Sequence, residues 1–89
     1  MRGPSDQCAA MCRNIQKAGI RRVLRLAKER GRVDPARDLA IIRRSGIGGY
    51  VQAGKAFSIS ETTARSVVAK YDQFARELLT ADAEKGGAQ

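Results

Sequence analysis

Apolar residues along this chain recur mostly three and four positions apart, which is the spacing of one face of an α-helix. No stretch alternates apolar and polar residues as a half-buried strand does. The pattern predicts an all-α fold, a compact bundle of about five helices with a long C-terminal one, at residues 6–18, 20–30, 35–45, 50–57 and 61–81. With 89 residues, the chain is expected to form one domain over 1–82, followed by a disordered tail at 83–89 with nothing to bury.

Three expected helix ends carry local signals. Ser5 or Asp6 can cap the first helix, because a side-chain oxygen there accepts a bond from a free N–H of the first turn. Gly19 is a natural stop for that helix. Asp34 followed by Pro35 is the clearest start, since proline at the first helical position loses only an N–H that has no partner.

The glycines at 46, 48 and 49 predict a flexible connector between two helices. They follow a helix rather than a strand and lack the Gly-Lys-Ser/Thr ending of a P-loop, so a nucleotide site is not expected. A contact between backbone amides of this connector and a DNA phosphate is left as an alternative.

Four of the five expected helices, all except 50–57, have an apolar face that we predict to be buried. These faces comprise Cys8, Met11, Cys12 and Ile15; Ile20, Val23, Leu24 and Ala27; Ala36, Leu39, Ala40 and Ile42, with Ile41 as a further candidate; and Ala64, Val67, Val68, Tyr71, Phe74, Ala75, Leu78 and Leu79.

The charge is strongly positive and uneven. Seventeen Lys and Arg against nine Asp and Glu give a net charge of +8, which in a small cytosolic protein points first to nucleic acid. Residues 1–46 hold twelve of the basic and four of the acidic residues, whereas 47–89 are neutral. The basic run at 21–32 places like charges on one side of a helix, which destabilises the helix unless an anionic partner offsets the repulsion. The alternative is that these charges form a solvated face.

The composition leaves little room for other chemistry. Without histidine there is no Ser-His or Cys-His nucleophile, and two cysteines cannot form a four-ligand zinc site, so we expect no enzyme, metal or cofactor. Cys8 and Cys12 are expected to be core residues, with pairing across a dimer left open. Asp34 and Asp38 are interpreted as capping and dipole residues. No membrane span or signal peptide is evident, and the expected location is cytoplasmic.

Residues 50–74 resemble the helix-turn-helix of DNA-binding proteins, in particular small plasmid and phage regulators such as the Kor-type repressors. The resemblance rests on a small residue in the first helix, Gly54, and on an apolar residue on either side of the turn, Phe57 and Ile59. It rests also on two apolar positions in the second helix, Ala64 and Val67. The chain departs from the pattern at Ser58, where glycine is usual. A plain pair of core helices is the alternative interpretation.

The resemblance implies which residues contact DNA. The expected base-reading residues are Ser60, Glu61, Thr62, Arg65 and Ser66, with Ala69 on the same face. Arg65 can form a bidentate bond to guanine and Glu61 can accept from cytosine N4. The expected phosphate contacts are Arg21, Arg22, Arg25, Arg43, Arg44, Lys55, Thr63 and Lys70.

The resemblance therefore predicts a sequence-specific regulator of transcription, a repressor acting as a homodimer on a palindromic double-stranded site. The dimer interface is expected either at Phe74, Leu78 and Leu79 or along the stripe from Cys8 to Ile15. No membrane or small-molecule partner is inferred. Two alternatives stay open: a DNA-binding component of phage packaging or assembly, and a basic inhibitor that binds an acidic protein surface. RNA binding is less favoured, because few aromatic residues remain for base stacking.

Overall fold

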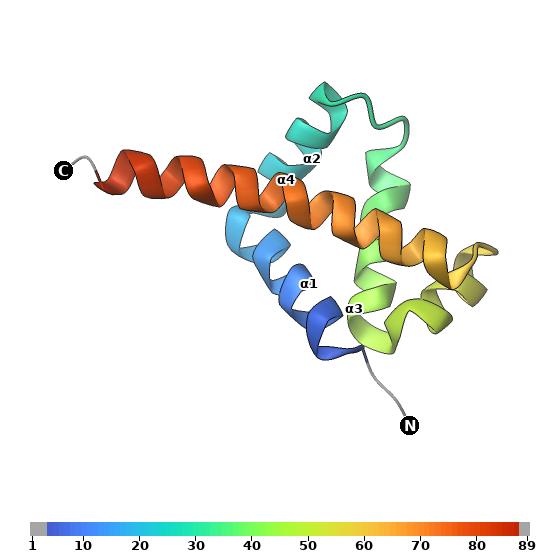
Figure 1. The fold of residues 1–89 in the computed structure, drawn as a ribbon. Coiled ribbons are helices and arrows are strands. Elements are labelled where there is room, and N and C mark those ends of the chain that lie inside the picture. The colour runs from blue at the N-terminus through green and yellow to red at the C-terminus, as the bar shows by residue number, and fades with distance from the viewer. Residues whose placement is uncertain (1–3, 88–89) are drawn as a thin grey trace.

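The computed structural model describes residues 4–87, and these form four α-helices and no strand. The helices are α1 (Asp6–Ala18), α2 (Ile20–Glu29), α3 (Pro35–Phe57) and α4 (Glu61–Gly87). Figure 1 shows α4 crossing in front of the other three, with its C-terminal end projecting beyond them. The all-α prediction is confirmed, and the predicted count of about five helices is one too many for this part of the chain.

Two side chains that were predicted to cap the starts of helices do so in the structure. The Cys8 N–H donates to Ser5 Oγ (3.2 Å), and the Arg37 N–H donates to Asp34 Oδ1 (3.0 Å) directly beside Pro35. Gly19 ends α1 with a φ of 102°, which an L-residue rarely adopts. These boundaries agree with the sequence because each is fixed by a local hydrogen bond or a single backbone angle.

The connector predicted at 46–49 is shorter than expected and consists of Gly49 alone. The helix continues through Gly46 and Gly48, and only Gly49 leaves helical geometry, with a φ of 90° and a ψ of 174°. A Cβ on Gly46 would lie 3.4 Å from Cys12 Sγ, so this side of α3 packs closely against α1. That packing offsets the low helix propensity of glycine. Residues 35–48 and 50–57 are consequently two helical arms that meet at the Gly49 break, and the second arm has the bounds predicted for a separate helix.

The C-terminal helix is longer than predicted. It was expected to end near residue 81, before a disordered tail at 83–89, yet α4 continues to Gly87. Arg22 of α2 forms a bidentate pair with Asp82 (2.9 and 2.8 Å), which ties this part of α4 to the bundle. Residues 88 and 89 lie outside the described part of the chain.

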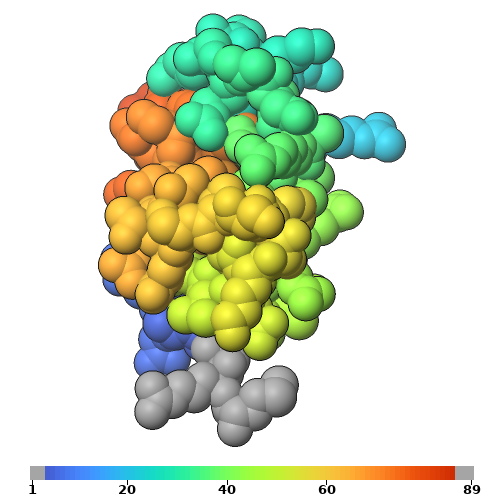
Figure 2. Space-filling view, turned by 90° about the vertical axis from the view of Figure 1, so that its right-hand side faces the viewer, coloured from blue at the N-terminus to red at the C-terminus, as the bar shows by residue number. Residues whose placement is uncertain are grey.

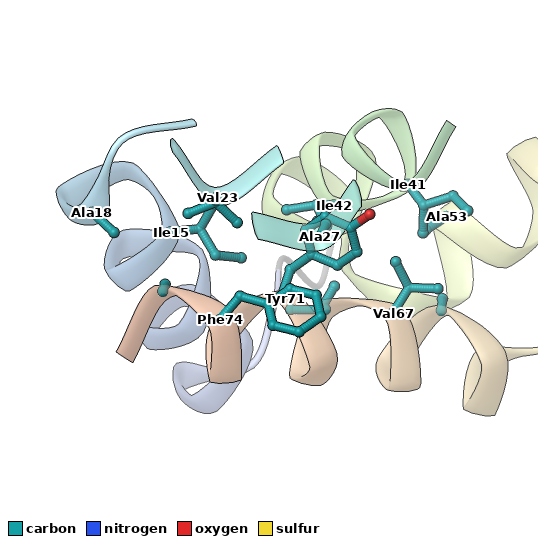
Figure 3. Close-up of a cluster of buried hydrophobic side chains, with 13 residues drawn as sticks. Ile15, Ala18, Val23, Ala27, Ile41, Ile42, Ala53, Val67, Tyr71 and Phe74 are labelled. Carbon is teal, nitrogen blue, oxygen red and sulfur yellow. The ribbon is translucent and has the colours of Figure 1, made fainter. Parts of the chain in front are cut away.

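The core lies between α4 and the other three helices, and Figure 3 shows Val67, Tyr71 and Phe74 of α4 directed toward it. The Tyr71 and Phe74 rings meet edge to face, with centroids 5.5 Å apart. Both predicted dimer surfaces contribute to this core: Phe74, Cys8 and Ile15 are at most 4% exposed, and Leu78 and Leu79 are half-buried against it. The stripe along α1 is therefore not a free interface.

The predicted inward face of α3 is only partly right. Ile41 and Ile42 are buried, but Ala36 is exposed, and Leu39 and Ala40 are only half-buried. The buried side of the first arm is instead Asp38, Ile41, Ile42 and Ser45. Both sides of this arm carry apolar residues, so spacing alone could not identify the side that faces the core.

Asp38 decides the orientation of α3, although the sequence suggested only a helix-dipole role. It is 7% exposed and accepts hydrogen bonds from the Tyr71 hydroxyl (2.6 Å) and from Arg32 Nε (3.0 Å). A buried carboxylate is tolerated when such partners satisfy it. The Arg32 guanidinium also lies 5.8 Å from the centre of the Tyr71 ring. This cluster fixes the α2–α3 loop, α3 and α4 to one another.

Candidate nucleic-acid interface

The turn between α3 and α4 is tight and closed by backbone hydrogen bonds. Ser58 adopts the left-handed conformation (φ 55°, ψ 44°). Its N–H and that of Ile59 both donate to the Gly54 carbonyl, the latter over 2.9 Å. A left-handed residue commonly ends a helix in this way, and serine occupies the position at a modest cost relative to glycine. The departure from glycine noted in the sequence therefore leaves the turn geometry intact.

The second arm of α3 approaches the start of α4 so closely that only glycine fits at the contact. A Cβ built on Gly54 would lie 2.7 Å from the backbone oxygen of Ile59. Ala64 and Val67 of α4 are buried, and Phe57 and Ile59 pack against the same core from either side of the turn. The five residues that carried the sequence resemblance are thus brought together around one turn.

The first turn of α4 is capped by its own hydroxyl groups. Ser60 Oγ accepts from the Thr63 N–H (3.0 Å) and lies 2.8 Å from Thr63 Oγ1. Both residues are exposed, but their hydroxyls are engaged with each other. Ser60 therefore acts first as the N-cap, with base reading as its second expected role.

The outward side of α4 carries short polar side chains. Thr62, Ser66 and Ala69 are exposed and fall on one stripe of the helix, and exposed Gln73 continues that stripe by one turn. Sequence reasoning stopped at Ala69 and missed Gln73, although its spacing from Ser66 and Ala69 was visible. The stripe contains no charge and no bulky group, so a base-pair edge can approach it closely.

Arg65 lies at the edge of this stripe and is held in place. One guanidinium nitrogen is 3.3 Å from Glu61 Oε1, and the guanidinium carbon lies 5.3 Å from the centre of the Tyr50 ring. Burial, together with the Cys8 thiol, raises the pKa of Tyr50 above its ordinary value. The four-residue spacing of Glu61 and Arg65 could have predicted their pairing. Nothing local in the sequence linked Arg65 to Tyr50.

The expected phosphate contacts fall into three groups, of which two lie along α4. Lys55, on the second arm of α3, and Thr63 and Lys70, on α4, are exposed near the turn. Arg21, Arg22 and Arg25 lie on α2, and Arg22 is paired with Asp82. Asp82 follows Glu61 by 21 residues on one helix, which is about 30 Å at 1.5 Å per residue. Arg22 therefore lies far from the proposed base-reading residues.

Arg43 and Arg44 belong to neither end of α4. They are exposed on the first arm of α3, on the side turned away from the core. Figure 2 shows the gold start of α4 in the middle of this face and green side chains of α3 at its right edge. The structure thus does not bring these two arginines together with Thr62, Arg65 and Ser66.

Pairing across the fold also changes the charge pattern of the sequence. Glu77 and Asp82, from the neutral half of the chain, pair with Arg30 and Arg22 from the basic half. The hydrogen bond to Arg22 lowers the pKa of Asp82, which keeps this pair ionised. Exposed pairs of this kind contribute little stability. They do neutralise part of α2, so its basic surface is smaller than its composition suggests.

The cysteines and the acidic residues suggest no other site. Cys8 is buried and its thiol points to the Ser45 carbonyl (3.6 Å). Burial, and then the neighbouring Cys8, raise the pKa of Cys12 to about 12, which is unlike a reactive thiol. Within residues 4–87, no three Cys, Asp or Glu side chains are grouped as metal ligands.

No protein-family model, curated protein sequence or solved structure matches this chain. None of the helices in the described part is long and apolar enough to cross a membrane.

Proposed function

We propose that this protein binds double-stranded DNA in a sequence-specific manner through a helix-turn-helix at residues 50–74. The observation that carries the proposal is the close approach of Gly54 to Ile59 across a left-handed turn, with the polar stripe of α4 directly after it. A simple pair of core helices requires neither the glycine contact nor an exposed stripe of small polar residues. The start of α4 is the part that enters the major groove.

The side chains on α4 have distinct roles in this proposal. Thr62 and Ser66 contact base edges directly, and Arg65 reads guanine from the edge of the stripe. Tyr50 and Glu61 hold the Arg65 side chain before DNA arrives, which reduces the entropy lost on binding. Glu61 is then available to accept from cytosine when Arg65 turns to the DNA.

Phosphate contacts position the helix in the groove. Lys55, on the second arm of α3, and Lys70, on α4, are exposed, and neither forms an ion pair within residues 4–87. Thr63 and the free N–H groups at the start of α4 add neutral donors. Arg21 and Arg25 on α2 contribute only where the duplex extends along α4.

In this proposal the protein is a repressor that acts as a homodimer on a palindromic DNA site. One recognition helix contacts too few base pairs for useful specificity, whereas two related by a two-fold axis read both half-sites. Half-buried Leu78 and Leu79 of α4, and half-buried Met11 and Cys12 of α1, are the parts of the predicted dimer surfaces that stay partly accessible.

The experiment that tests this function is selection of bound sequences from a random duplex pool at about 150 mM salt, where exposed charges more than about 8 Å apart are screened. We expect a palindromic motif whose half-site spacing gives the distance between recognition helices. The double variant Thr62→Ala, Ser66→Ala should lose the motif, whereas Thr80→Ala, an exposed threonine further along α4, should retain it. A pool without any enriched motif contradicts sequence-specific binding.

A further inference from the structure

The side of the bundle away from α4 carries an apolar groove between α1 and the first arm of α3, with a volume of about 400 Å³. Its apolar lining comes mainly from Cys12, Ile15, Ile20, Leu39, Ile42 and Ile47. A second hollow on the other side of Leu39 and Ile47 continues the apolar surface over Ala36 and Ala40 to Phe57. Among them, Ala36, Leu39 and Ala40 are the residues of α3 whose predicted burial in the core was wrong or incomplete.

Ile47 stands at the centre of this surface and is 77% exposed. Burial stabilises an isoleucine side chain, so an exposed one beside an apolar groove favours a partner that covers it. Val51, four residues later and 52% exposed, lies beyond the Gly49 kink and outside the groove lining.

Only positive charge surrounds the groove. Arg13 and Arg43 are part of its lining, and Arg44 lines the adjoining hollow. None of these arginines forms an ion pair within residues 4–87, and no Asp or Glu lines either hollow. The acidic side chains that form ion pairs are committed elsewhere, to Arg22, Arg30, Arg32, Arg65 and Arg76.

We propose that this groove binds an acidic amphipathic helix of a partner protein. An apolar stripe on that helix packs over Leu39 and Ile47, and its flanking carboxylates pair with Arg13 and Arg43. The groove runs along α1 from Ala9 to Gln16, about 10 Å at 1.5 Å per residue, which accommodates roughly two helical turns. Helix-in-groove recognition with complementary charge is a common mode of protein association.

The composition of the surface favours this occupant over two others. In a symmetric dimer the same patch meets itself, so Arg13 and Arg43 would oppose their own copies without an acid in the lining to offset them. A duplex would satisfy the arginines but would leave Ile47 and Leu39 against phosphates and sugars. Only a partner that is both apolar and acidic satisfies both parts of the surface.

The groove and the proposed DNA-binding stripe point in opposite directions. Asp38 of α3 bonds to Tyr71 of α4 across the core. Ile47 follows Asp38 by nine residues and Thr62 precedes Tyr71 by nine, which is two and a half helical turns in each case. Both therefore lie on the far side of their helix from the core. A partner in the groove leaves the α4 stripe free, so this inference does not depend on the proposed function.

The test is selection from a library of 16-residue helical peptides on the immobilised full chain at about 150 mM salt. Positions at helical spacing i, i+3, i+4 and i+7 vary among apolar residues, and the remaining positions vary among Glu, Lys and Gln. We expect enrichment of Glu over Lys beside a bulky apolar stripe. Fluorescence anisotropy with one enriched peptide should show binding about tenfold weaker or more for Ile47→Gln and for Arg43→Glu.

Matched variants separate the groove from general charge. Val51→Gln removes a neighbouring exposed apolar residue, and Arg37→Glu reverses an exposed charge on the same helix outside both hollows, so both should bind as wild type does. All four positions are exposed, and circular dichroism checks that each variant folds.

Three results would overturn the proposal. The first is a library without enrichment, or enriched peptides that bind Ile47→Gln as well as wild type. The second is a dimer in sedimentation equilibrium that Ile47→Gln dissociates, which assigns the surface to a second copy. The third is a duplex affinity that falls with Ile47→Gln as much as peptide affinity does, which assigns the surface to DNA.

Discussion

Gly54 lies so close to the Ile59 carbonyl that a single methyl group at Gly54 would be 2.7 Å from that oxygen. Both atoms involved belong to the backbone or are fixed to it, so no side-chain rotation relieves the contact. The spacing between the second arm of α3 and the start of α4 therefore depends on the absence of a side chain at Gly54.

Gly54→Ala should lower the free energy of unfolding by about 1–3 kcal/mol, because the clash outweighs the gain of up to about 1 kcal/mol that alanine gives within a helix. Gly46→Ala is the matched control: its Cβ meets Cys12 Sγ at 3.4 Å, and we expect no loss of stability. Urea denaturation followed by circular dichroism measures both. Equal effects of the two variants would contradict the close approach.

Arg65→Ala should weaken binding to the selected DNA site by about 1–3 kcal/mol and relax preference at one base pair. Binding to random DNA should fall much less, because phosphates are contacted mainly by other residues. Affinity measurements on the selected and a scrambled duplex test this, with Arg37→Ala as the control for loss of one positive charge. Equal losses on both duplexes would rule out base reading by Arg65.

Lys70→Ala should weaken binding to all duplexes by a similar factor, since a phosphate contact is the same in every sequence. The slope of log affinity against log salt concentration should become shallower by about 0.9, as expected for one lost phosphate contact on B-form DNA. Lys85→Ala, at the projecting end of α4, should leave the slope unchanged. A larger change of the slope for Lys85→Ala than for Lys70→Ala would place the duplex at the C-terminal end of α4 and contradict the proposed interface.

Tyr71→Phe should lower the free energy of unfolding by about 1.5–3 kcal/mol, because a buried hydroxyl bonded to the Asp38 carboxylate is lost. Arg32→Met, measured alone and combined with Tyr71→Phe, tests whether the three residues act as one cluster. We expect the combined loss to differ from the sum of the single losses, since both donors serve the same carboxylate oxygen. Simple additivity would show that the cluster is not cooperative.

Stability should fall as the pH rises above 9, in part through Cys12. In the unfolded chain this thiol ionises near its ordinary pKa of 9.0, whereas burial keeps it protonated in the folded state until about pH 12. The folded protein therefore binds more protons in this window, and rising pH favours unfolding. Burial and Asp38 likewise raise the pKa of Tyr71, which adds to the loss at higher pH. Denaturation midpoints at pH 8 and 10.5 should differ less for Cys12→Ala than for wild type, and an unchanged difference would exclude Cys12 as a cause.

The helix starts could be predicted from the sequence because the signal is local. Ser5 and Asp34 bond to N–H groups three residues away, and such a pair is visible in a linear sequence. The orientation of α3 could not be predicted, since it depends on a bond between Asp38 and Tyr71, 33 residues apart. An aspartate at a helix start is ordinarily a dipole residue, and only the folded chain shows that this one is buried.

The same distinction applies to the candidate site. The turn and its packing residues lie within one short window, and their arrangement around Gly54 agrees with the sequence pattern. The phosphate contacts other than Thr63 were inferred from charge, which carries no information on direction. The structure places Arg22 beside Asp82 and Arg43 on the groove away from α4, because ion pairs and helix orientation are set by contacts distant in sequence.

The projecting end of α4 also affects how the molecule rotates in solution. The principal extents are 46 × 29 × 17 Å, and the 27 residues of α4 account for about 40 Å of length. A body of this shape rotates faster about its long axis than end over end. N–H bonds in α4 lie nearly parallel to the helix, and Figure 1 shows the first arm of α3 crossing it. Backbone nitrogen relaxation in α4 is therefore governed by the slow end-over-end rotation, and rigid residues in the two helices relax at different rates without any difference in internal motion.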